Sequence, residues 1–241
     1  RVSADTRRVV RWFVSVMRIS LILLTGVVIF FALNMGASGI APSFAAIYGS
    51  KWVRKKQALA LFGFFVIVGA VVLGNNVAWT LGNGILAKKY LNLDVVLIIL
   101  TSAAVSLFLA NILKIPQSTS QVTVGAIVGV GLYYRQIYTK VLFLKILPMW
   151  VMLPLLSYVL TFFLYRLVYP PEHDNLHIYQ KMFANEKKLK HTSLLVSCYV
   201  AFAIGTNNVS NAVGPLFGAG ILGINSGLLL IAPLFGVGAW L

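Results

Sequence analysis

The sequence predicts an all-α protein whose helices cross a lipid bilayer several times. Of its 241 residues, 59% are hydrophobic and only 10% are charged, and the mean hydropathy is +0.89. Soluble domains carry about 25% charged residues, and disordered chains are poor in hydrophobic residues, so the composition excludes both classes. Long apolar runs separated by clusters of Lys and Arg are typical of transmembrane helices joined by loops.

Most of the charged residues lie in clusters between the apolar runs. Twenty Lys and Arg against five Asp and Glu give a formal net charge of +15, and no Asp, Glu, Lys or Arg follows Lys190. Basic clusters beside apolar spans are typical of cytoplasmic loops, and these clusters lack the interleaved aromatic residues of a single-strand binder. We therefore expect a multi-pass protein of the plasma (inner) membrane, in contact with the lipid bilayer and without a nucleic-acid partner.

The candidate spans are apolar runs of about 20 residues or more, the length that crosses the hydrocarbon core. These runs cover residues 19–48, 57–73, 95–113, 141–165 and 192–241, with shorter apolar segments at 77–87 and 122–134. The predicted organisation is a basic N-terminal arm (1–18), a first transmembrane repeat (19–166), a polar loop (167–190) and the start of a second, truncated repeat (191–241). The arm contains five arginines and no nearby cleavage site, so we interpret it as an interfacial amphipathic helix and not as a secretory signal.

Two Gly-rich stretches interrupt the first and last spans. Residues 34–39 read Asn-Met-Gly-Ala-Ser-Gly and residues 205–208 read Gly-Thr-Asn-Asn, and the two stretches align when Gly36 is placed on Gly205. We interpret both as unwound breaks, because paired broken helices in corresponding halves are typical of secondary transporters with inverted repeats. The free N–H groups of half-helices bind anions without any charged side chain.

A third candidate element is the polar stretch 116–121, which reads Pro-Gln-Ser-Thr-Ser-Gln. Proline at a helix start followed by hydroxyl side chains places hydrogen-bond donors beside free backbone N–H groups. The apolar run after it contains three glycines, which allow close helix packing, and we expect a re-entrant hairpin here. One such stretch alone would be an ordinary helix cap, so the functional interpretation depends on the two breaks and the cap occurring together.

No catalytic or metal-binding site is predicted. His173 and His177 have the spacing of metal ligands, but the neighbouring Pro-Pro pair and the polarity of the segment favour a solvated loop. Cys198 is the sole cysteine, which excludes an intrachain disulfide and favours a small buried hydrophobic role. The apolar segments contain no carboxylate for a hydrolytic triad, so we expect a protein that is not an enzyme.

In these stretches the sequence resembles the inorganic phosphate transporter (PiT) family, over residues 30–241. That family repeats a Gly-Ala-Asn-Asp-Val-x-Asn-Ala signature, and a Pro-x-Ser-Thr-Thr-His signature follows each copy. Residues 205–214 (Gly-Thr-Asn-Asn-Val-Ser-Asn-Ala-Val-Gly) resemble the first signature, and residues 116–131 resemble the second. The sequence of 34–39 is most similar to the bacterial sulfate permease branch. The family's second Pro-x-Ser-Thr motif would lie beyond Leu241, so we expect a fragment of a longer transporter.

Together with these stretches, the resemblance implies a secondary transporter that moves a tetrahedral oxyanion, phosphate or sulfate, by alternating access. We expect the hydroxyl groups of 118–120 to donate to the anion, the asparagines to shape the helix beside it, and the stretch 36–39 to supply the matching element of the first repeat. The predicted substrate-binding residues are Ser118, Thr119, Ser120, Gln121, Asn207, Asn208, Asn211, Ser38, Gly36 and Gly39.

The sequence departs from the family at its charged positions. Ser38 and Gly39 stand where the family has Asn-Asp, Asn208 replaces the second Asp, and Gln121 replaces the His. In the family the aspartates are tied to cation coupling, so their loss puts coupling to Na⁺ or H⁺ in question. It also favours sulfate, which only accepts hydrogen bonds, over phosphate, which keeps an O–H donor.

Two alternatives stay open at this point. An uncoupled anion channel or facilitator would need no carboxylate, and a non-transporting membrane subunit would need no substrate site. The sequence indicates no resident cofactor beyond a coupling Na⁺ or H⁺, and it leaves the oligomeric state open, a homo-oligomer included.

Overall fold

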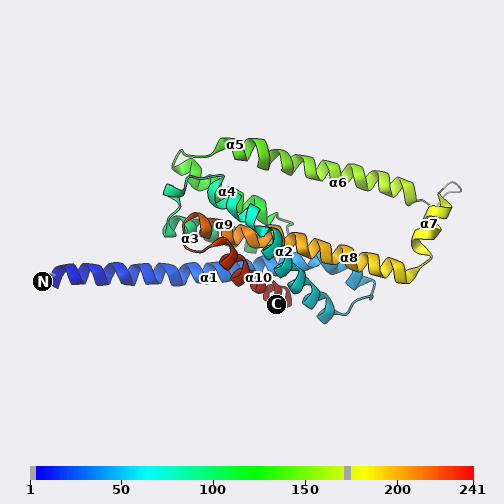
Figure 1. Ribbon diagram of the computed structural model, residues 1–241, viewed down its shortest axis with the longest axis horizontal. Coiled ribbons are helices and arrows are strands. Elements are labelled where there is room, and N and C mark those ends of the chain that lie inside the picture. Colours follow the sequence, from blue (N-terminus) through cyan, green and yellow to red (C-terminus); the bar gives the residue numbers. More distant parts are fainter. Residues whose placement is uncertain (1–3, 171–174) are drawn as a thin grey trace.

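The computed structural model describes residues 4–170 and 175–241, and the regular secondary structure in these two ranges is helical (Figure 1). The elements in order are α1 (Ala4–Gly49), α2 (Lys55–Asn83), η1 (Lys88–Tyr90), α3 (Leu93–Ile112), α4 (Thr119–Tyr133), α5 (Thr139–Val141), η2 (Leu142–Ile146), α6 (Leu147–Val168), α7 (Leu176–Phe183), α8 (Glu186–Ile204), η3 (Gly205–Val209), α9 (Ser210–Gly218) and α10 (Ile224–Trp240). Of the η elements, η1 is a 3₁₀-helix, whereas η2 and η3 are π-helical.

Within the described ranges, five helical segments are long and apolar enough to cross a membrane. They are Ser15–Gly49, Lys55–Asn83, Leu93–Ile112, Thr139–Val168 and Glu186–Gly218. These segments confirm the predicted multi-pass, all-α class. The 15-residue helix α4 is about 22 Å long, shorter than a hydrocarbon core of about 30 Å, and its packing against α3 fits the expected re-entrant hairpin.

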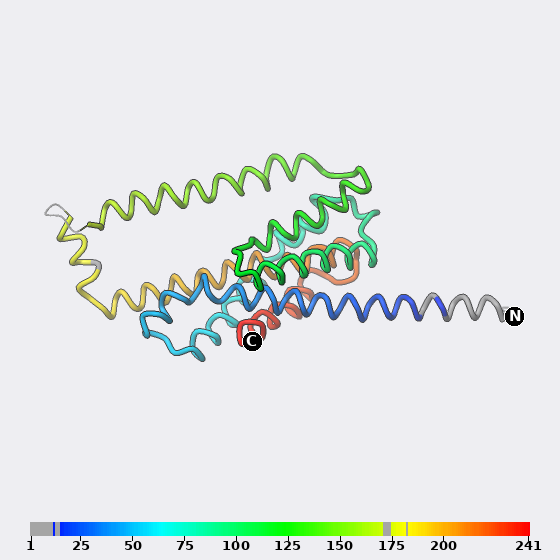
Figure 2. Tube along the Cα trace, turned by 180° about the vertical axis from the view of Figure 1, so that it is seen from behind, coloured from blue at the N-terminus to red at the C-terminus, as the bar shows by residue number. Residues whose placement is uncertain are grey.

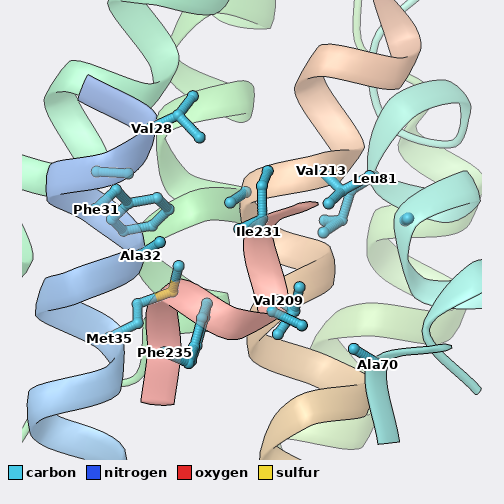
Figure 3. Packing of buried hydrophobic residues seen from close by; sticks show 14 of the residues in the cluster. Val28, Phe31, Ala32, Met35, Ala70, Leu81, Val209, Val213, Ile231 and Phe235 are labelled. Atoms are coloured by element: carbon cyan, nitrogen blue, oxygen red, sulfur yellow. The ribbon is translucent and has the colours of Figure 1, made fainter. Parts of the chain in front are cut away.

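The core lies where α1, α2, α8, α9 and α10 cross one another (Figures 1 and 2). Its largest fully buried side chains include Phe31, Met35, Phe62 and Phe235. In Figure 3, Met35 of α1 and Phe235 of α10 lie side by side. Because lipid is as apolar as these side chains, close packing and not exclusion of water holds such helices together.

Glycines bring α1 and α10 into backbone contact. A Cβ added to Gly36 of α1 would collide with the Phe235 carbonyl group of α10. In return, a Cβ added to Gly238 of α10 would collide with the Leu33 carbonyl group of α1. Each helix therefore offers a glycine to the backbone of the other, as small residues do at close crossings in membranes.

The crossing of α2 with α8 and η3 repeats this arrangement. A Cβ on Gly205 would collide with the Val66 carbonyl group, and a Cβ on Gly69 would collide with the Phe202 carbonyl group. The alignment that places Gly36 on Gly205 also superposes all four residues of the first crossing on the four of the second. Since α1 and α8 run in opposite directions (Figures 1 and 2), the two halves form an inverted repeat.

The predicted break at residues 34–39 is wrong, because α1 is one continuous helix through this stretch. Its glycines serve packing instead of unwinding: Gly36 contacts α10, and Gly39 lies against the ring of Phe62. The Ser38 hydroxyl donates to two carbonyl groups of its own helix, both at 3.2 Å, so it needs no partner from outside.

The second interruption is also not unwound. Gly205–Val209 forms the π-helical turn η3 inside a helix that continues from α8 into α9. The Thr206 hydroxyl donates to the Gly69 carbonyl group at 3.0 Å, and the Ser210 hydroxyl donates to the Gly74 carbonyl group at 2.9 Å. Both contacts fix the turn to α2, so the glycine-rich motif marks a change of helix type and not a break.

Two further segments differ from the expected layout. From Ala4 onwards the basic arm is a straight continuation of α1, and it is not a separate interfacial helix (Figure 1). Beyond its first turn, where Leu147 and Trp150 pack against the core, the helix α6 lies apart from the core in Figures 1 and 2, and none of its residues is fully buried. Its apolar faces are therefore available to lipid or to other protein.

Candidate anion-binding site

The polar stretch 116–121 forms the N-terminus of α4. Ser118 is the N-cap residue, and its Oγ accepts the backbone N–H of Gln121 at 3.4 Å. The backbone N–H groups of Thr119 and Ser120, in the first turn, have no partner inside the helix. These groups carry the positive end of the helix dipole, which favours an anion.

Two asparagines from η3 and α9 contact this N-terminus. Asn207 donates through Nδ2 to Ser120 Oγ at 2.8 Å, and Asn211 Nδ2 lies 3.3 Å from both Ser120 Oγ and Thr119 Oγ1. The two asparagines are four residues apart, so they lie on one side of their helix. The structure thus brings four of the predicted site residues together from segments about 90 residues apart in the chain.

The direction of these hydrogen bonds decides what the site offers. Ser120 Oγ accepts from two amide groups, which occupies both of its lone pairs. Its hydroxyl hydrogen is then left to donate. A deprotonated oxyanion accepts hydrogen bonds, so an oriented hydroxyl group beside free backbone N–H groups is complementary to it.

A cleft of about 610 Å³ opens beside these residues. Its polar lining consists of Asn76 and Thr80 of α2, Ser118 and Ser120 of α4, Lys145 of η2, and Asn207 and Asn211 of η3 and α9. The apolar wall includes Trp150 of α6. Among the described residues that line the cleft, Lys145 is charged and none is acidic, so the electrostatic potential of the cleft favours anions.

The remaining predicted residues lie elsewhere. Asn208 is half-buried outside the cleft lining, and its Oδ1 lies 3.5 Å from the amide nitrogen of the preceding asparagine. Gln121 is exposed and lines a separate hollow between α3 and α4. Ser38, Gly36 and Gly39 belong to the packed part of α1 and do not line the cleft.

One buried acceptor beside the cleft has no partner. Asn211 is 1% exposed, and its Oδ1 has no hydrogen bond among the described residues. A buried amide oxygen without a partner is unfavourable unless a ligand or an ion satisfies it. Away from the cleft lining, Asn111 Nδ2 of α3 donates to Asn34 Oδ1 of α1 at 2.6 Å, which is the interhelical role that polar residues take in membranes.

Sequence reasoning missed three polar residues of the cleft lining, Asn76, Thr80 and Lys145. Lys145 carries a signal that could have found it, because it is a charged residue inside the apolar segment Thr139–Val168. Thr80 carries no such signal, since its hydroxyl group bonds back to the carbonyl group of Asn76 in its own helix.

No metal centre is found in the part of the chain that the structure describes: it contains no group of three or more His, Cys, Asp or Glu side chains that could hold a metal ion. His177 is exposed, whereas Glu172, His173 and Asp174 lie outside the described residues. Cys198 is buried, which confirms its predicted hydrophobic role.

The chain is similar in sequence to known permeases and transporters. The chain is 42% identical over 214 residues to the sulfate permease CysP of Bacillus subtilis, covering 88% of this chain and 59% of the relative. It is 33% identical over 142 residues to the sodium-dependent phosphate transporter 1 of Mus musculus, covering 55% of this chain and 21% of the relative. The chain therefore spans three fifths or less of the length of these relatives.

The fold has a counterpart among solved structures. The sodium-dependent phosphate transporter superposes with a TM-score of 0.70, with 23% sequence identity, over 91% of this chain and 74% of that one. Residues 35–184 match the sequence profile of the Phosphate transporter family. This family consists of transporters and not of enzymes, and with its spanning helices this protein is an integral membrane protein. The chain belongs to the phosphate transporter family.

Proposed function

We propose that the protein transports sulfate across the plasma membrane by alternating access, coupled to Na⁺ or H⁺. The cleft between α2, α4, η2 and η3 is the substrate site. The Ser118, Thr119 and Ser120 hydroxyl groups and the free N–H groups of α4 donate to the anion. Asn207 and Asn211 hold the Ser120 hydroxyl group in the donating orientation, and Asn211 does the same for the Thr119 hydroxyl group.

The observation that carries this proposal is the pair of amide donors on Ser120 Oγ, at 2.8 and 3.3 Å. A hydroxyl group that accepts twice offers its hydrogen to the cleft. Sulfate at neutral pH is only an acceptor, whereas hydrogen phosphate also needs an acceptor for its own O–H. A site that leaves a substrate donor unpaired rejects that substrate by orders of magnitude, on the order of 10⁴ in favourable cases.

Uptake of radiolabelled sulfate by cells that express the intact gene and lack their own sulfate transporters tests the choice of substrate. We expect saturable sulfate uptake that a tenfold excess of phosphate leaves nearly unchanged. Phosphate uptake that excess sulfate does not inhibit would reverse the assignment.

Two observations support cation coupling. The mouse relative is named for sodium-dependent phosphate transport. In this chain, the unpartnered Asn211 Oδ1 is an oxygen ligand of the kind that hard cations take. Two treatments identify the coupling ion: replacement of Na⁺ by choline, and collapse of the proton gradient with an ionophore. The coupling ion is the one whose removal or collapse stops sulfate uptake against its concentration gradient.

An anion channel is a second candidate, and one observation favours it: no carboxylate lines the cleft among the described residues. A channel would continue to pass sulfate down its gradient after both cation gradients are collapsed, and it would not accumulate sulfate. Accumulation above the external concentration excludes the channel.

A further inference from the structure

Lys145 occupies an unusual place for a charged residue. It belongs to η2, the π-helical turn that follows α5 near the start of the apolar segment Thr139–Val168, and its side chain is exposed to the cleft that Ser118, Ser120 and Asn207 line. Lysine within a spanning segment is costly unless a counter-charge or water stabilises it. No ion pair of Lys145 occurs among the described residues, and no acidic side chain lines the cleft beside it.

The two π-helical turns of the chain's described part meet at this one cleft. Turn η2 contributes Lys145 and Ile146, and turn η3 contributes Asn207. A π-helical turn adds a residue to one turn of helix and rotates the side chains that follow, which is why such turns are frequent at functional sites. The lysine, the helix N-terminus and the oriented hydroxyl groups therefore surround the same space.

Resting on the proposed function, we propose that Lys145 is the charge-bearing residue of the substrate site and makes it selective for doubly charged tetrahedral oxyanions. The hydrogen-bond donors of α4 fit any tetrahedral oxyanion. A fixed ammonium group favours a dianion over a monoanion of the same shape, because the Coulomb attraction doubles with the charge of the ligand. The missing counter-charge of Lys145 is then the substrate itself.

The same chemistry could come from a lipid headgroup, since a lysine near the end of a span also reaches the phosphate groups of the bilayer. A free anion and a lipid phosphate group predict different behaviour of Lys145. A free anion binds Lys145 reversibly and is transported. A lipid phosphate group would stay bound to the lysine whether or not sulfate is present.

The test compares three variants of the intact gene product: Lys145→Gln removes the charge, Lys145→Arg keeps it, and Lys140→Gln is the matched control on the neighbouring turn, outside the cleft lining. We expect Lys145→Gln to raise the KM for sulfate about tenfold or more, as loss of a charge-assisted contact does. Lys145→Arg should retain most of the affinity, and Lys140→Gln should match the unmodified protein.

The selectivity between dianions and monoanions is the measurement that would not change if Lys145 had a purely structural role. Perchlorate is tetrahedral and carries one charge, so it competes with sulfate for the donors but gains less from the lysine. In Lys145→Gln, perchlorate should become a stronger competitor relative to the KM for sulfate. An unchanged KM and an unchanged competition ratio in Lys145→Gln would overturn the proposal.

Sulfate-dependent thermal stabilisation of the purified protein separates this proposal from the proposed function and from a lipid partner. Stabilisation of the unmodified protein that Lys145→Gln loses supports the lysine assignment even if sulfate uptake fails, in which case only the transport proposal falls. Stabilisation by anionic lipid that sulfate does not alter, and that Lys145→Gln abolishes, would assign the lysine to a headgroup instead.

Discussion

Asn207 Nδ2 donates to Ser120 Oγ at 2.8 Å and thereby connects the π-helical turn η3 to the N-terminus of α4, 87 residues earlier in the chain. Neither residue is charged, and each is ordinary in its own helix. Their contact joins the N-terminus of α4 and the π-helical turn η3 into one polar surface, and the proposed substrate site lies on this surface.

Replacing Ser118 by Ala together with Thr119 by Val should abolish sulfate uptake. Both changes remove hydroxyl donors while nearly preserving side-chain volume, so membrane insertion and the α3–α4 hairpin should persist. Radiolabelled uptake is measured beside the amount of protein in the membrane. Normal transport by the double variant at an equal amount of protein would remove these residues from the site.

Replacing Asn207 by Ala should raise the KM for sulfate about tenfold, since Ser120 then loses the donor that orients it. The single variants Asn207→Ala and Ser120→Ala and their combination form a double-mutant cycle. Because the two side chains act through one contact, the combined variant should cost less than the sum of the single changes. Additive effects would mean that the amide and the hydroxyl group act independently.

Replacing Asn208 by Asp should weaken sulfate binding and make uptake more dependent on the cation. The new carboxylate would stand beside Asn207, near the anion, where like charges repel and a cation is attracted. Sulfate uptake is measured over a series of Na⁺ concentrations and pH values. A variant with the cation dependence and KM of the unmodified protein would show that position 208 has no influence on the site.

Adding a methyl group at Gly36 should destabilise the protein by about 1–3 kcal/mol, as overpacking does, because a Cβ there meets the Phe235 carbonyl group. Gly125→Ala is the matched control: it also lies inside a helix, but a Cβ there has no neighbour within 4 Å. The control should be neutral or stabilising by up to about 1 kcal/mol, because alanine favours helix. Thermal denaturation in detergent compares the two, and equal midpoints would contradict the close crossing.

The sequence predicts the spans well because a long apolar run has few other stable forms. It fails at 34–39 for a physical reason: glycine lowers helix propensity by about 1 kcal/mol, but it also lets two backbones touch, and in α1 the second property decides. At 205–209 a glycine followed by polar residues gives a π-helical turn, which no local rule distinguishes from a break.

The site is predictable in part. The hydroxyl groups at 118–120 and the asparagines at 207 and 211 are visible as polar residues among apolar ones, and contacts of 2.8 and 3.3 Å join the asparagines to Thr119 and Ser120. Their pairing across the chain, and the approach of Lys145, depend on how α2, η2 and η3 pack. A one-dimensional pattern contains no information on that packing.

The contact of Gly36 with α10 and the contact of Gly205 with α2 are two copies of the same helix crossing in one molecule. The two crossings use the same four positions of the repeat, and each joins a helix of one half to a helix of the other, but they are surrounded by different side chains. A glycine-to-alanine substitution at one crossing can therefore be compared with the equivalent substitution at the other. Any difference between the two results measures what the surrounding side chains and the π-helical turn at Gly205 contribute.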